Sequence, residues 1–68
     1  MNEETFNVSV RQFLKKFGIT AQREIERAVD GALKSGKLKG DETLKARAVL
    51  RIEGVPADIT VEGDITLG

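Results

Sequence analysis

Apolar and polar residues follow a helical period in the first half of the chain and a strand period in the second. In the stretch 20–36 the apolar residues fall on one arc of a helix and the charged residues lie opposite it. That arc contains Ala21, Ile25, Ala28, Val29, Ala32 and Leu33. An earlier stretch has apolar residues at i, i+3, i+4 and i+7, namely Val10, Phe13, Leu14 and Phe17. The pattern predicts two helices, over residues 9–17 and 20–35.

Residues with known helix-end preferences stand at the limits of both stretches. Ser9, with Gln12 three residues on, forms a capping box and predicts the start of the first helix. Gly18 is placed to end that helix and Thr20 to cap the next, while Gly36 is placed to end the second. Before Ser9, alternating apolar residues allow a short extended segment: Phe6, Val8 and Val10.

After residue 40 the apolar residues alternate with polar ones, which is typical of strands with one covered face. Strands are predicted near 43–53 and 58–67, joined by a turn at residues 54–57 that contains the chain's single proline. If Glu53 faces Asp58, Leu50 pairs with Val61 on the apolar face. On the polar face Arg47 then pairs with Asp64. The strands therefore form an antiparallel hairpin.

These elements predict a single small α+β domain over residues 1–68. It consists of a two-helix corner packed on an antiparallel β-hairpin, in the order helix–helix–strand–strand. Residues from both halves are expected to be buried together: Ile25, Val29, Leu33, Leu50, Ile52 and Val61.

The inventory of reactive side chains restricts the chemistry. Among the 68 residues there is no histidine, cysteine, tyrosine or tryptophan. General acid–base catalysis would then need carboxylates or lysines with strongly shifted pKa values, which require a deep pocket that a chain of this length has little room to build. No spacing of acidic residues resembles a calcium loop. We therefore expect no enzyme activity, no cofactor, no metal site and no small-molecule substrate.

The charges suggest a nucleic-acid interface as an alternative. Residues 10–39 carry eight basic and three acidic side chains, although the whole chain has no net charge. Helix, turn, helix and hairpin is the order of part of a winged helix-turn-helix domain, in which Arg23, Arg27 and Lys34 would line the exposed face of the reading helix. Against this, a further helix is lacking, and Glu26 and Asp30 interrupt the basic line and can form i,i+3 pairs with the arginines. Nucleic acid is not favoured.

The favoured class is a small interaction module, most simply a homodimer or a module for an unidentified protein partner. A two-stranded hairpin is marginally stable alone and has two open edges, and without cysteine no disulfide supports the fold. A monomer whose N-terminal segment covers one edge is the competing expectation. The acidic start is unlike a signal peptide, and no apolar run approaches the ~20 residues that cross a bilayer, so a cytoplasmic location without membrane contact is expected.

Four segments carry a resemblance to a known family: residues 1–7, 11–16, 22–29 and 36–40. Together they make the chain similar, over its whole length, to a family of short bacterial proteins of unknown function. That resemblance implies a stand-alone small protein, and it supplies no catalytic or ligand-binding residues.

Overall fold

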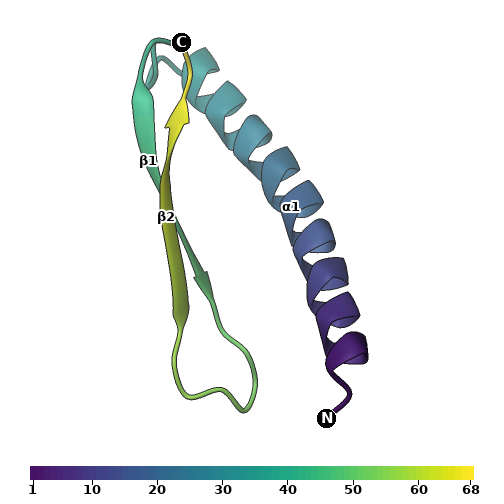
Figure 1. Cartoon of the computed structure of the whole chain (residues 1–68). Coiled ribbons are helices and arrows are strands. Elements are labelled where there is room, and N and C mark those ends of the chain that lie inside the picture. The colour runs from purple at the N-terminus through teal and green to yellow at the C-terminus, as the bar shows by residue number, and fades with distance from the viewer. The chain divides into compact units, whose positions relative to one another are not determined.

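A single long helix precedes a β-hairpin in the computed structural model, which describes all residues 1–68 (Figure 1). Helix α1 spans Glu3–Lys34, strand β1 spans Thr43–Leu50 and strand β2 spans Ile59–Thr66. The chain divides into two compact units, Met1–Lys37 and Leu38–Gly68. The predicted two-helix corner is wrong, since one helix covers both predicted helices and the residues between them.

The helix begins six residues before the predicted start because a stronger cap lies upstream. Asn2 is the N-cap, in extended conformation, and its side chain accepts a hydrogen bond from the backbone N–H of Thr5 at 3.0 Å. Glu3 and Glu4 place negative charge in the first turn, where the helix dipole favours it. Ser9, predicted to be the cap, lies inside the helix and donates its hydroxyl to the carbonyl of Phe6 at 2.9 Å. The short extended segment predicted before residue 9 is therefore also wrong.

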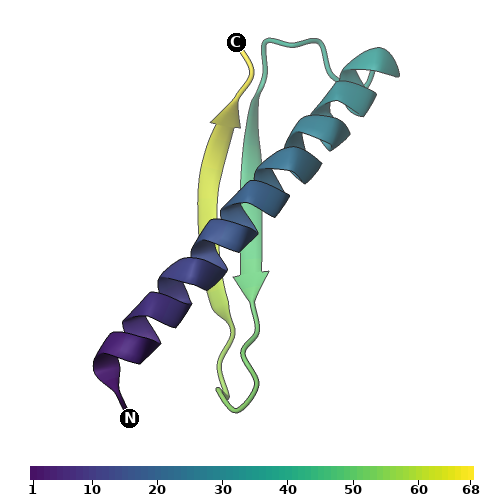
Figure 2. The ribbon, with the colours of Figure 1, turned by 90° about the vertical axis from the view of Figure 1, so that its right-hand side faces the viewer.

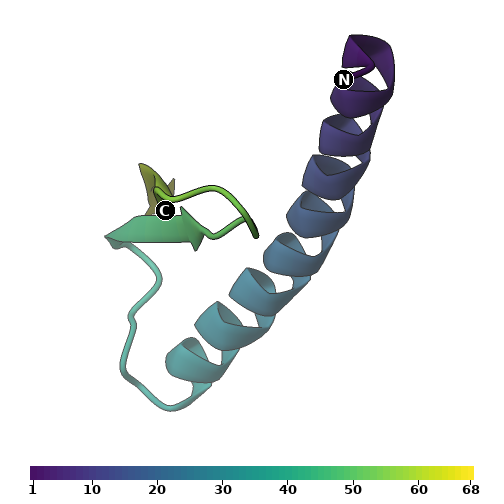
Figure 3. The same cartoon turned by 90° about the horizontal axis from the view of Figure 1, so that it is seen from below.

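Gly18 does not end a helix. It has no positive φ, unlike Gly36, and α1 continues through it without interruption, as two further views show (Figures 2 and 3). A glycine inside a helix costs about 1 kcal/mol relative to alanine. The apolar face on both sides of Gly18 keeps helical spacing, so a packed helix face would offset this cost.

The C-terminus of α1 lies where the sequence predicts it. Gly36 adopts φ +80° directly after the C-cap Ser35. The backbone N–H of Lys37 donates to the carbonyl of Ala32 at 2.9 Å, and that of Gly36 donates to the carbonyl of Leu33 at 3.2 Å. These two bonds form a Schellman motif, which needs a left-handed residue at Gly36.

The hairpin is confirmed, with a register two residues away from the predicted one. Leu50 pairs with Ile59 rather than Val61, and Arg47 pairs with Glu62 rather than Asp64. Because the difference is two residues, the same side chains stay on the same face. In β1 the exposed and half-buried residues alternate as expected for one covered face.

A longer connection than predicted explains the register. The strands end at Leu50 and resume at Ile59, so residues 51–58 form the loop. Within it Val55 donates its N–H to the carbonyl of Ile52 at 3.0 Å, and Gly54, at φ +83°, occupies the third position of the turn. A positive φ there is what a type II turn requires.

Neither unit contains a buried side chain. The core predicted from the sequence is therefore wrong, and its members are exposed or at most half-buried: Ile25, Val29, Leu33, Leu50, Ile52 and Val61. A chain that buries no side chain lacks the main source of folding free energy.

Candidate interaction surfaces

The apolar residues of α1 form one continuous line along the helix, which we call the helix stripe. Its members are separated by 4, 4 and 3 residues in repeating order: Phe6, Val10, Leu14, Phe17, Ala21, Ile25, Ala28 and Ala32. A 4-4-3 order is an 11-residue repeat, or about 3.67 residues per turn. A 7-residue repeat counted from Phe6 instead reaches Thr20 and Arg27, which are polar. The stripe therefore follows the 11-residue period.

The large members of the stripe are well exposed. Phe6, Phe17 and the neighbouring Phe13 are between 39 and 52% exposed. The rings of Phe13 and Phe17 lie against each other with centroids 6.3 Å apart, an ordinary separation for an aromatic pair. An exposed run of this length and character is typical of a surface that binds another apolar surface.

The three basic residues of the nucleic-acid hypothesis lie along one line of α1, on the side opposite the helix stripe. Arg27 lies 3.5 Å from Glu24, and Lys34 lies 2.9 Å from Asp30, both in ion pairs with well-exposed side chains. The pairs expected between Arg23 and Glu26 and between Arg27 and Asp30 do not form. Exposed pairs of this kind contribute less than about 1 kcal/mol each.

The winged-helix hypothesis loses its structural basis. It needs a turn between two helices near Gly18, and α1 has none. The polar side of one long helix therefore carries Arg23, Arg27 and Lys34.

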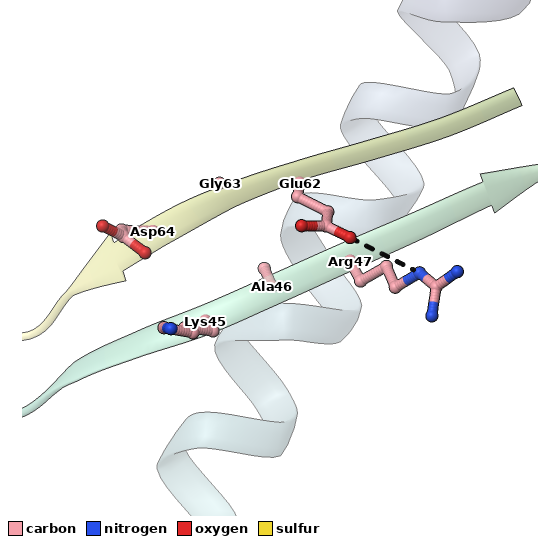
Figure 4. Close-up of a pocket in the computed structure, with 6 residues that line it drawn as sticks. All are labelled: Lys45, Ala46, Arg47, Glu62, Gly63 and Asp64. Atoms are coloured by element: carbon pink, nitrogen blue, oxygen red, sulfur yellow. Dashed lines mark ion pairs between the residues drawn. The ribbon is translucent and has the colours of Figure 1, made fainter.

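The hairpin has one apolar and one charged face. Leu44, Ala46, Ala48 and Leu50 share the first face with their β2 partners. On the other, Arg47 faces Glu62, with Nε and Oε1 separated by 3.8 Å (Figure 4). A shallow hollow lies here, lined by Lys45, Ala46, Arg47, Glu62, Gly63 and Asp64. Its two acids stand opposite two bases on the paired strand, so its charges are internally balanced.

Glu42 organises the entry to the hairpin, a role that the sequence patterns did not reveal. Its carboxylate accepts the backbone N–H of Lys39 at 2.9 Å and of Gly40 at 2.8 Å. These bonds, that of Lys39 first, lower the pKa of Glu42 below its ordinary value of 4.5. The carbonyl of Glu42 also accepts the N–H of Leu67 at 2.9 Å, which extends the pairing beyond β2.

The structure shows no metal-binding cluster and no helix that could span a membrane. No group of three or more histidine, cysteine, aspartate or glutamate residues is placed to hold a metal ion. Helix α1 lacks an apolar segment long enough to pass through a bilayer.

Comparison with known proteins assigns the chain to a family. The model of a family of unknown function, DUF6494, matches residues 1–68, so the chain belongs to that family. This confirms the resemblance to a family of unknown function over the whole chain. No curated protein and no solved structure matches the chain.

Proposed function

We propose that this protein is a non-enzymatic interaction module that self-associates, with the helix stripe packed against the same surface of a second copy. The observation that carries the proposal is the stripe itself, which runs over most of α1 with no member buried. The lack of histidine, cysteine and tyrosine supports a binding role rather than a catalytic one.

The length of the stripe supports a second copy as its cover. From Phe6 to Ala32 it extends about 40 Å at 1.5 Å per residue. An eight-residue strand extends only about 27 Å. The paired strands of one hairpin are therefore shorter than the stripe, whereas a second helix of equal length matches it fully.

The available area is sufficient for a stable pair. At the observed exposures the three phenylalanines offer about 300 Å² per copy, since an aromatic side chain carries roughly 150–250 Å². The aliphatic members add a similar area, so two copies would bury about 1,200 Å², the lower end of the range for specific interfaces.

Light scattering after gel filtration, over a concentration series, tests the proposal. At roughly 10 µM or more we expect a mass of twice 7.4 kDa, as suits a modest interface. A mass of 7.4 kDa at every concentration would contradict it.

Leu14 and Ile19 provide a matched pair of variants. They are 49 and 52% exposed, but Leu14 belongs to the stripe and Ile19 lies on the opposite side of α1. Leu14→Asp should abolish the dimer because it would bury an unpaired charge, and Ile19→Asp should preserve it. Equal loss in both variants would mean that the stripe is not the interface.

A further inference from the structure

The two halves of the helix stripe differ in the size of their side chains. Its first half contains Phe6, Leu14 and Phe17, and Phe13 stands beside it. Its second half contains Ala21, Ala28 and Ala32, with Ile25 as the one large member. Because paired helices keep a nearly constant separation of about 8–10 Å, large residues on one helix fit best against small residues on the other.

Parallel pairing in register would oppose Phe6 to the partner's Phe6 and Ala32 to the partner's Ala32. One end would then be overpacked and the other would contain voids, and both defects destabilise a packed interface. Pairing in the opposite direction can place most of the large residues of one half on the alanines of the other half.

We propose, on the basis of the proposed self-association, that the two copies pair antiparallel, with the phenylalanine half of each helix on the alanine half of the other. In the register that pairs the two ends of the stripe, Phe6 with Ala32, the residue numbers of facing positions sum to 38. Phe6 then faces the partner's Ala32, Val10 the partner's Ala28 and Phe17 the partner's Ala21. Phe13 faces the partner's Ile25, and Leu14 lies level with the partner's Glu24. The two-fold axis passes at the level of residue 19.

The charges at the helix ends agree with this direction. The first turn of α1 is acidic, with Glu3 and Glu4, and the last turn carries Lys34. Antiparallel pairing at this register places Glu4 level with the partner's Lys34, and it opposes the two helix dipoles favourably. Parallel pairing would bring the acidic first turns of both copies together.

The 11-residue period also limits the shape of the pair. At the ~100° per residue of a straight helix, an 11-residue repeat drifts about 20° in the sense opposite to a heptad, which favours a right-handed supercoil. The paired helices therefore cross with a slight right-handed twist rather than as a left-handed coiled coil.

Spin-label distances in the full chain test the direction and the register. Because the chain has no cysteine, one introduced cysteine gives a single labelling site. Thr5, Gln12 and Ile19 lie on the side of α1 away from the stripe, seven residues apart. In the antiparallel pair, labels at Ile19→Cys should lie level with each other. Those at Gln12→Cys should be separated by about 21 Å along the axis and those at Thr5→Cys by about 42 Å, at 1.5 Å per residue.

Three outcomes of double electron–electron resonance have distinct meanings. Distances that grow from Ile19 to Gln12 to Thr5 support the antiparallel pair, and labels that lie level at Ile19 support this register. Equal distances at the three sites would show a parallel pair, which overturns the inference and leaves self-association standing. No coupling at any site, with helicity retained in circular dichroism, would overturn both proposals, because the stripe would then be covered by the hairpin of its own chain or by a different partner.

Discussion

Replacing Phe17 by alanine distinguishes between a helix that is stabilised by a partner and a helix that is stable alone. Phe17 is 39% exposed, or about 80 Å² of a side chain of roughly 200 Å². At about 25 cal/mol per Å², covering that area contributes about 2 kcal/mol per copy. A dimer loses the contribution twice, about 4 kcal/mol, so the dissociation constant should rise roughly 700-fold.

The sign of the helicity change makes this test sharp. Alanine has a higher helix propensity than phenylalanine, so in an isolated helix Phe17→Ala would leave the helicity unchanged or raise it. We expect circular dichroism at a fixed concentration to show lower helicity, because the variant dissociates. Ile19→Ala, on the opposite side of α1, is the control and should keep the dimer. If Phe17→Ala keeps both mass and helicity, the reasoning from the stripe is refuted.

Three further predictions concern stability. Gly18→Ala should stabilise α1 by about 0.5–1 kcal/mol in thermal unfolding, since an added Cβ there meets nothing within 4 Å. Gly36→Ala should destabilise the protein by about 1–2 kcal/mol because the φ of Gly36 is +80°. The reversed order of stabilities would contradict a helix that is continuous through Gly18. Because the folded pKa of Glu42 is lowered, its contribution to hairpin stability is full above pH 4.5 and is lost as the pH falls through the folded pKa. Hydrogen exchange at the backbone amides of Lys39 and Gly40 should show this loss, and Glu42→Gln should remove the pH dependence. Arg27→Ala should change the free energy of unfolding by less than about 0.5 kcal/mol, and a larger change in urea titration would assign its pair with Glu24 a structural role.

The hairpin and the end of α1 could be predicted from the sequence because their signals are local. Alternation of side chains fixes which strand residues share a face, and Gly36 is placed where a left-handed residue ends a helix. The register could not be predicted as surely. The predicted turn at residues 54–57 and the observed eight-residue loop put the same side chains on the same face of the hairpin. The two connections differ only in which residues of β1 and β2 face each other.

The continuity of α1 was missed because two signals compete at Gly18. Glycine followed by Ile-Thr is typical of a helix end, yet Leu14, Phe17, Ala21 and Ile25 keep their spacing across it. The 11-residue period was the signal that could have shown one helix, and it becomes visible only when the whole stretch is counted together. The alignment of Arg23, Arg27 and Lys34 was predictable, whereas their ion-pair partners depend on rotamers that sequence does not fix.

The concentration dependence of helicity tests most directly whether α1 is held by a second copy. Circular dichroism at 222 nm and the thermal midpoint are measured over a dilution series of the full chain. Self-association predicts that both fall on dilution, together with the change from twice 7.4 kDa to 7.4 kDa in mass. A helicity and a midpoint that stay constant over the whole series would contradict it.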